Sequence, residues 1–468
     1  MPRRWSIALA LAGLLAGCDT QISPSAYDDF LHRESSPAQR AAAGDWSPSS
    51  PTSTQPATAP ADTGWDIQIT EQSGLNDYLA YAALHSPRMR SAFAAWQAAV
   101  EQVPQDRALG DPIVTYRLFL MSATGKTDRN VYEINQVFPW LGKLELRGDI
   151  ASSGAQAARH RFDAQWLKVS LGVQQAYAEL YYLQRETRIT QQNIELVNQA
   201  ESVARARYAA SAAGHPDVIR AQVEQGRLAD RLRTLQNLRA PTAARLNAAL
   251  NRPPGAPVGE VTQLAIPHVP FSDEQLLAWA AEGNPELAAL DREVIARRQE
   301  IALARKAYYP DVMLGAGFEN DEEEGDMVMG MVSLNLPIWY DKLAAGVRQA
   351  RWRHLQAIQD RQAMLNSLDS DAERALFELR DALRKQSLYR DTLIPKARQG
   401  LQASLSAFRT GGQSFLDYLD AQRVLLEFEL SYERALADSV QRLAELEMLT
   451  GRPLRSAGAE GPPQRLAD

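Results

Sequence analysis

The stretch Ala407–Gln422, with the sequence AFRTGGQSFLDYLDAQ, decides the fold of this chain. An amphipathic helical pattern ends there, and Gly411-Gly412 supplies the conformational freedom that a sharp reversal needs. A second helical pattern begins directly afterwards, with Asp417 and Asp420 in its first turns. The stretch therefore predicts two long antiparallel helices that are joined by a tight turn.

An earlier stretch, Ala206–Gln222 (ARYAASAAGHPDVIRAQ), has the same layout. Three of its features recur at an offset of 200 positions (408 − 208): Tyr208 aligns with Phe408, Asp217 with Asp417, and Ala221-Gln222 with Ala421-Gln422. Because one offset accounts for all three matches, we predict that the chain is an internal duplication.

The sequence around each stretch repeats the same order of elements. Ser86-Pro87 and Asn284-Pro285 each predict the start of a helix, because a polar cap precedes a proline at the first helical position. Strand-like segments follow near 113–121 and 131–137 in the first repeat, and near 312–318 and 327–336 in the second. Long helical patterns then cover about 141–210 and 340–410, and shorter ones return over about 216–251 and 414–450.

These lengths are unusual for a compact domain. A helix of roughly seventy residues, at about 1.5 Å each, is about 100 Å long. Strands of about nine to eleven residues have the length that crosses a bilayer. Four strands cannot close a barrel, whereas three chains would supply twelve and leave no unpaired backbone in lipid. The predicted fold is mainly α with a small β part: duplicated long antiparallel coiled-coil helices that form an α-barrel, and four membrane strands per chain that close a 12-stranded barrel in a trimer.

The N-terminus has the pattern of an export signal. Residues 1–17 combine a basic start, a short apolar run and small residues ahead of Cys18, the only cysteine. The pattern resembles the lipobox of bacterial lipoproteins, which implies that Cys18 carries lipid; an ordinary signal peptide with an incidental cysteine is the alternative. Asp19 resembles an inner-membrane retention signal of enteric bacteria, so its effect on sorting stays open.

Composition divides the rest of the chain. Residues 18–65 are rich in Ser, Pro, Thr and Ala and predict the lipidated cysteine followed by a disordered tether. We assign the repeats to residues 70–252 and 271–452, with a Pro-rich connector at 253–270 and a disordered tail at 453–468. The net charge of −7 speaks against a nucleic-acid partner. The sequence contains no catalytic constellation, phosphate loop or metal-ligand spacing, so we expect neither an enzyme nor a cofactor.

Taken in order, the motifs resemble a known family. The duplicated topology, the helix openings SPR and NPEL, the segment FPWLGK at 138–143 and the tip motif LDYLDAQ at 416–422 are similar to TolC-type outer-membrane efflux channels. The resemblance covers roughly residues 70–452. It implies a passive homotrimeric duct in outer-membrane lipid, whose α-barrel crosses the periplasm to a periplasmic adaptor and an inner-membrane pump of the resistance-nodulation-division type. FPWLGKLELRG is similar to the heavy-metal-cation branch, which favours metal cations over drugs as cargo.

The resemblance also assigns residues at the helical tips. Asp417 and Asp420 match a family motif at the periplasmic aperture, which implies a ring of six carboxylates that favours cations. The alternative is that these acids complement the dipole of their helix. Asp217 and Tyr208 lie at the other tip, where Asp217 matches a position that ties neighbouring coils together. The tyrosine and arginine expected as its partners are replaced by Phe408 and Gln413, so we expect apolar packing to hold the aperture instead.

Methionines form one further pattern. Met327, Met329 and Met331 share one face of a strand, with Met313 and Met121 on other strands. Thioethers suit Cu(I), so a methionine-based metal-binding protein is one alternative to a channel; ordinary packing, with this face toward lipid, is the other interpretation. A non-transporting periplasmic coiled-coil scaffold lipoprotein is a further alternative, which explains the helices and Cys18 but not the two matched hairpins.

Overall fold

The computed structural model describes residues 68–70, 72–120, 127–211, 214–261, 263–267, 269–321 and 325–454. The predicted signal peptide, Cys18, Asp19, the tether up to residue 65, Met121 and the tail from residue 455 lie outside these ranges.

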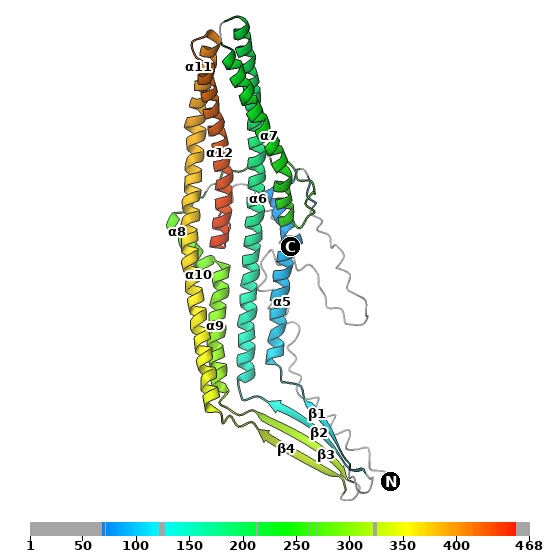
Figure 1. The fold of residues 1–468 in the computed structure, drawn as a ribbon. Coiled ribbons are helices and arrows are strands. Elements are labelled where there is room, and N and C mark those ends of the chain that lie inside the picture. The colour runs from blue at the N-terminus through cyan, green and yellow to red at the C-terminus, as the bar shows by residue number, and fades with distance from the viewer. Residues whose placement is uncertain are drawn as a thin grey trace, which may run out of the picture. The chain divides into compact units, whose positions relative to one another are not determined.

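Each repeat contains two short helices, a β-hairpin and a long helical hairpin, so the duplicated fold is confirmed (Figure 1). The first repeat consists of α4 (Leu75–His85), α5 (Pro87–Arg107), β1 (Ile113–Leu120), β2 (Thr127–Phe138), α6 (Lys143–Ala209) and α7 (His215–Ala249). The second consists of α8 (Asp273–Gly283), α9 (Pro285–Lys306), β3 (Val312–Asp321), β4 (Met327–Leu334), α10 (Tyr340–Leu388), the π-helical turn η1 (Tyr389–Leu393), α11 (Ile394–Thr410) and α12 (Phe415–Thr450). The described residues of the predicted connector, 253–270, contain no helix or strand.

Both predicted helix starts are present, but only one polar residue caps with its side chain: Ser86 precedes α5 without a side-chain cap hydrogen bond. The side-chain oxygen of Asn284 accepts hydrogen bonds from the backbone N–H groups of Glu286 and Leu287, at 2.9 and 3.1 Å, which caps α9. Directly after the two returning helices, Asn251 and Gly451 have φ angles of 58° and 68°, which lie in the left-handed region. Asparagine and glycine tolerate that conformation best, so the ends of the repeats follow directly from the sequence.

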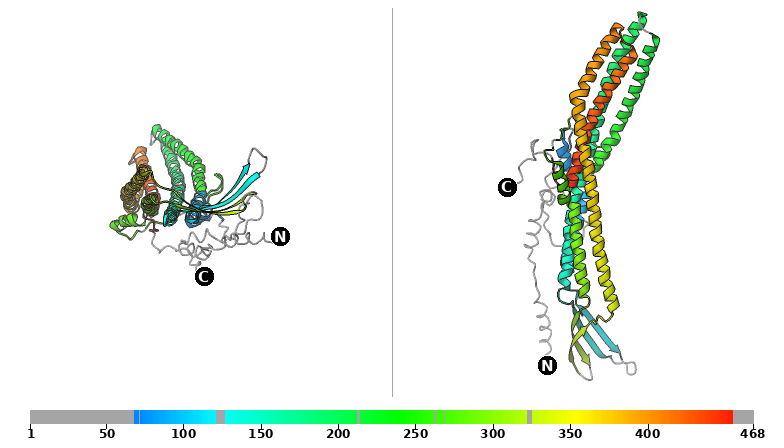
Figure 2. Two further views of the ribbon diagram at one scale, coloured as in Figure 1. Left: turned by 90° about the horizontal axis from the view of Figure 1, so that it is seen from below. Right: turned by 90° about the vertical axis from the view of Figure 1, so that its left-hand side faces the viewer.

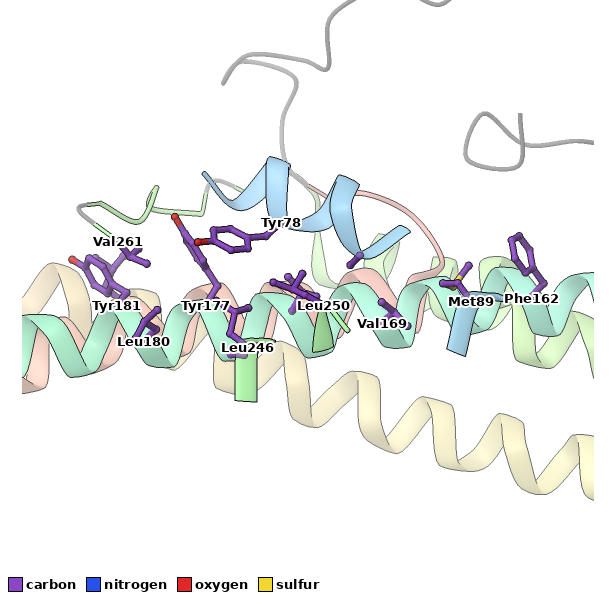
Figure 3. Close-up of a cluster of buried hydrophobic side chains, with 14 residues drawn as sticks. Tyr78, Met89, Phe162, Val169, Tyr177, Leu180, Tyr181, Leu246, Leu250 and Val261 are labelled. Carbon is purple, nitrogen blue, oxygen red and sulfur yellow. The ribbon is translucent and has the colours of Figure 1, made fainter. Parts of the chain in front are cut away.

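The long helices share one buried pattern. Val169, Val173, Ala176 and Leu180 of α6 are buried, and so are their counterparts in α10 at an offset of 199: Leu368, Ala372, Ala375 and Leu379. Spacings of three and four residues place such side chains on one helical face. In the first repeat this face packs with α4, α7 and the connector, through side chains such as Tyr78 and Leu246 (Figure 3). In the second it packs with α8 and α12.

The long helical pattern predicted over 340–410 is confirmed, and a π-helical turn at residues 389–393 divides it into α10 and α11. Pro395 follows the turn, at the start of α11, and has no N–H for an α-helical hydrogen bond. The first repeat has Glu195 at the matching position, and α6 is continuous there. A π turn accommodates one additional residue. This insertion explains why the offset between repeats grows from 199 along the helices to 200 at the tips.

The four strands form one antiparallel sheet in the order β1-β2-β3-β4, at the end of the helices opposite the tips (Figures 1 and 2). β2 starts earlier than predicted and β3 ends later, because the two strands pair with each other from Phe138–Val312 to Arg129–Asp321. β4 ends at Leu334 rather than near 336, before Pro337, which has no N–H to donate.

The two faces of the sheet differ in chemistry. One face is apolar, and many of its side chains are exposed: Val114, Tyr116, Leu118, Tyr132, Leu314, Val328 and Val332. The other carries two cross-strand ion pairs, Arg117–Glu133 and Arg129–Glu319. Met329 lies on this second face, because the register places it beside Gly317 and Gly317 beside Glu133. The methionine face is therefore the polar one, and the opposite face is the one suited to lipid.

A largely buried ion pair joins the repeats where the sheet meets the helices. The Nζ of Lys143, at the start of α6, donates to Asp311 Oδ1 at 2.7 Å and to the carbonyl oxygen of Tyr309 at 3.0 Å. The backbone N–H of Trp140 donates to the same carboxylate oxygen at 2.8 Å. Gly142 between them has a φ of 77°, which permits the sharp turn into α6. The segment FPWLGK is thus a structural joint between the repeats.

Asp311 is ionised over most of the pH range. Burial alone would raise the pKa of Asp311, but the hydrogen bonds from Lys143 and Trp140 outweigh it and hold that pKa below its ordinary value. The joint is therefore stabilising above the pKa that Asp311 has in the unfolded chain. This contribution is lost as the pH falls through the lowered pKa of the folded state.

We predict that Asp311→Ala destabilises the chain by about 3 kcal/mol, the lower end of the range for breaking a buried ion pair, because Lys143 keeps a buried charge without its partner. Urea unfolding followed by helical circular dichroism measures this loss. Asp360→Ala, which removes an exposed aspartate of α10, is the control and should stay within about 0.5 kcal/mol of the unsubstituted chain. Equal midpoints for the two variants would contradict a structural role for the joint.

Candidate functional site at the helical tips

The turns of both repeats lie at the same end of the molecule, far from the sheet (Figures 1 and 2). One hydrophobic cluster spans the two tips: Ala200 and Ala204 of α6 and Val218 of α7 pack with Phe408 of α11 and with Phe415 and Tyr418 of α12. The tips are therefore held together within one chain by side chains from both repeats.

Phe408 lies at the centre of this cluster and is fully buried. Its ring lies 5.5 Å from that of Phe415 and 6.2 Å from that of Tyr418. The guanidinium of Arg207, from the first repeat, lies 5.0 Å from the Phe408 ring and donates to the Phe408 carbonyl oxygen at 2.6 Å. Gln413 accepts a hydrogen bond from the Ser404 hydroxyl at 2.8 Å, within its own repeat. Within a chain, apolar packing and one arginine thus join the repeats at these positions.

Tyr208 and Asp217 make their contacts inside the first repeat. The Tyr208 ring lies 5.2 Å from that of His215, and 48% of the residue is exposed. Asp217 pairs with Arg220 of its own helix at 3.3 Å. Tyr208 and Phe408 are equivalent in the duplication but differ completely in burial, so only Phe408 supports the tip from inside.

Asp417 serves as a helix cap. Its carboxylate accepts hydrogen bonds from the backbone N–H of Ser414 at 3.0 Å and from the Ser414 hydroxyl at 2.8 Å, and its own N–H donates to the Ser414 oxygen at 3.3 Å. The two bonds from Ser414 lower the pKa of Asp417, so this carboxylate is ionised at neutral pH. The alternative role weighed from the sequence, that of an acid stabilising its helix terminus, is therefore present in this chain.

Asp420 differs from Asp417. Its side chain is 66% exposed and lies 4.0 Å from Arg423, at the limit of an ion pair. Arg423 bonds more closely, at 2.7 Å, to Glu224 of α7, which is buried. Both predicted aperture aspartates are exposed, but the Asp417 carboxylate is held by two hydrogen bonds from Ser414, whereas the Asp420 carboxylate lies 4.0 Å from Arg423.

Sequence reasoning missed the buried charges that connect the repeats. Glu433 of α12 accepts a hydrogen bond from the Tyr181 hydroxyl at 2.7 Å and from Arg185 at 2.8 Å, both on α6. Glu224 of α7 likewise accepts a hydrogen bond from Arg423 of α12, at 2.7 Å. The signal was present, since each glutamate occupies a position that the helical period assigns to the core. Buried charges are rare unless they are paired, so such positions predict partners on a neighbouring helix.

In the part of the chain that the structure describes, no cluster of three or more His, Cys, Asp or Glu side chains has a geometry that could hold a metal ion. None of the described helices is both long and apolar enough to cross a bilayer.

The fold and the tip motif define a class of proteins with duplicated long helices and β-hairpins, and comparisons with known proteins agree. The family model "Outer membrane efflux protein" matches residues 276–452. The cobalt-zinc-cadmium resistance protein CzcC of Cupriavidus metallidurans is 25% identical over 287 residues, which are 59% of this chain and 66% of CzcC. Nodulation protein T of Rhizobium leguminosarum bv. trifolii is 25% identical over 341 residues, which are 68% of this chain and 72% of that protein.

The solved structure of CusC superposes with a TM-score of 0.71 at 15% identity and covers 85% of this chain and 99% of CusC. Residues 276–452 of this chain match the outer membrane efflux protein family, and the described residues have the fold of CusC.

We predict that Phe408→Ala loosens the tip, because removing a fully buried phenylalanine costs about 3–5 kcal/mol. Hydrogen exchange of the backbone amides of α11 and α12 should accelerate near the turn. Tyr208→Ala, at the equivalent and exposed position, is the matched control and should leave exchange nearly unchanged. Equal acceleration in both variants would contradict the central role of Phe408.

Proposed function

We propose that three copies of this chain form one channel, with their hairpins closing a 12-stranded barrel in the outer membrane. The observation that carries the proposal is the sheet itself. β1 and β4 are its edge strands, so their outer backbone groups need a further strand. In lipid these groups must be paired, which a closed ring of copies achieves. The apolar face of the sheet would meet lipid, and the face with two ion pairs would line the pore.

Aromatic side chains at the junction support this placement. Trp140 stacks on Tyr309 at 5.2 Å, and Tyr308 lies 6.5 Å from Tyr340, all next to the ends of the strands. Tryptophan and tyrosine are enriched where a membrane meets water, because their rings are apolar and their edges polar. A non-transporting scaffold would leave both the apolar face and the open sheet edges without a purpose.

In this proposal the helices continue the barrel into the periplasm as a passive duct. The tips would dock on a periplasmic adaptor and an inner-membrane pump of the resistance-nodulation-division type, which would supply the energy. The resemblance of the whole repeat order to efflux channels supports these partners. Cys18, with its lipobox-like context, would add a lipid anchor at the N-terminus.

For the cargo we propose metal cations. The support is the similarity to CzcC, whose name describes resistance to cobalt, zinc and cadmium. An exposed Asp420 from each copy at the aperture would also favour cations over anions.

We predict that Asp420→Asn lowers the cation selectivity of the pore, whereas Asp417→Asn affects it less, because the Asp417 carboxylate is held in the helix cap. Single-channel recording of the purified protein in a planar bilayer measures both. If neither substitution changes the selectivity, the proposed carboxylate ring is contradicted, but the proposed channel is not. A trimeric sample that forms no pore would indicate a tip that is sealed at rest, and a monomeric sample would contradict the trimer.

We predict that cells without this chain lose tolerance to Co²⁺, Zn²⁺ and Cd²⁺ but not to uncharged drugs. Growth at graded concentrations, with the intact gene supplied in trans as the control, measures the loss. Equal sensitisation to both classes would replace the metal assignment with a mixed cargo. Unchanged growth with both would leave the cargo proposal without support.

A further inference from the structure

Two large aromatic side chains stand exposed on α10. Trp352 and Phe377 are each 69% exposed. Their offset in the sequence (377 − 352) corresponds to about seven turns of an α-helix, so they lie on nearly the same helical face, about 38 Å from each other. Exposed aromatic groups of this size are common at protein interfaces, where they act as anchors.

Two hollows lie between helices of the first repeat. The α5–α6 hollow has a volume of about 380 Å³ and is lined mainly by small residues, among them Ala95, Ala99, Gly154 and Ala158. The α6–α7 hollow has a volume of about 240 Å³, and its lining includes Glu179, Leu183, Glu186 and Leu238.

The spacing of the hollows equals that of the aromatic residues. Three lining positions of the α5–α6 hollow recur in the α6–α7 hollow at the same offset along α6 (179 − 154): Gly154 with Glu179, Ala158 with Leu183, and Arg161 with Glu186. Because this offset also corresponds to about seven turns, the two hollows open on nearly the same face of α6.

The heights along the helices also agree. α6 and α10 both start at the sheet and run toward the tips (Figure 1). Gly154 lies about three turns beyond Lys143, the first residue of α6. Trp352 likewise lies about three turns beyond Tyr340, the first residue of α10. The larger aromatic side chain is thus level with the larger hollow, and Phe377 is level with the smaller one.

The partner that would bring these features together is a second copy of the chain. α5 packs on α6, α6 on α9, and α9 on α10, so that α5 and α10 lie at opposite ends of this row (Figure 1). α5 leads into β1 and α10 follows β4, so the open strand edges belong to the same two ends. If β4 of one copy pairs with β1 of the next, α10 lies along the first repeat of that neighbour.

We propose that Trp352 inserts into the α5–α6 hollow of the neighbouring copy and Phe377 into its α6–α7 hollow, so that the two pairs fix the register between subunits. The inference rests on the proposed trimer and adds to it the residues that hold adjacent copies together. It also explains why the residues that line the α5–α6 hollow have such small side chains, since alanine and glycine leave room for an indole ring.

The test is cysteine cross-linking of the full-length protein with a short bifunctional maleimide. The pairs Trp352→Cys with Ala95→Cys, and Phe377→Cys with Leu238→Cys, should each give covalent dimers and trimers on a denaturing gel. The crossed pair, Trp352→Cys with Leu238→Cys, should give none, because about seven helical turns would separate its thiols. Single-cysteine variants control for Cys18.

The native mass of each sample distinguishes failure of the proposed interface from failure of the proposed trimer. A trimer in which neither matched pair cross-links would overturn this interface and leave the proposed channel standing. A monomer would overturn both. As an independent measurement, Trp352→Ala should lower the temperature at which the trimer dissociates, whereas Arg353→Ala, on the next face of α10, should not. Equal shifts in these two variants would also overturn the role of Trp352.

Discussion

The packing of α6 against helices of both repeats is the interaction on which the structure depends. α6 contacts α4, α5 and α7 of its own repeat, and α9 and α12 of the other. From Val169 to Ala204, buried positions recur along α6 at spacings of three and four residues. A helix this long has no compact core around it, so each part of its surface must find a different partner. The duplication supplies those partners, because the second repeat presents the same apolar pattern at nearly the same spacing.

The two ends of this helical assembly are controlled by different chemistry. At the sheet end, Lys143 and Asp311 form a largely buried ion pair that ties the start of α6 to the entrance of β3. The strand register then decides which face is apolar, because a shift of one residue would exchange the two faces. At the tips the repeats are joined by a fully buried Phe408 and by the buried carboxylate of Glu224. A buried ion pair thus holds the sheet end, and an apolar cluster with one buried carboxylate holds the tips.

At the tip, the two aspartates of the motif LDYLDAQ make different contacts. Asp417 and Asp420 are three residues apart and look equivalent in the sequence. The first caps α12 through Ser414, and the second remains mostly exposed. A carboxylate that accepts two hydrogen bonds from its own helix terminus is held in place and partly neutralised by them. The Asp420 carboxylate lies 4.0 Å from Arg423, so its negative charge can act on ions that approach the tip.

The sequence alone determined the duplication, the order of elements, the helix caps at Asn251, Asn284 and Gly451, and the two hairpins. These features depend on local backbone preference and on periodicity, which are properties of short segments. Three-dimensional packing decided the rest. The π turn before Pro395 resolves a conflict between a proline and a helix that its neighbours require to continue. The polar surroundings of the methionines came from strand pairing, and the partners of Glu224 and Glu433 came from helices about two hundred residues away in the chain. The helical period marks Glu224 and Glu433 as core positions, but only the folded arrangement specifies which charge meets which.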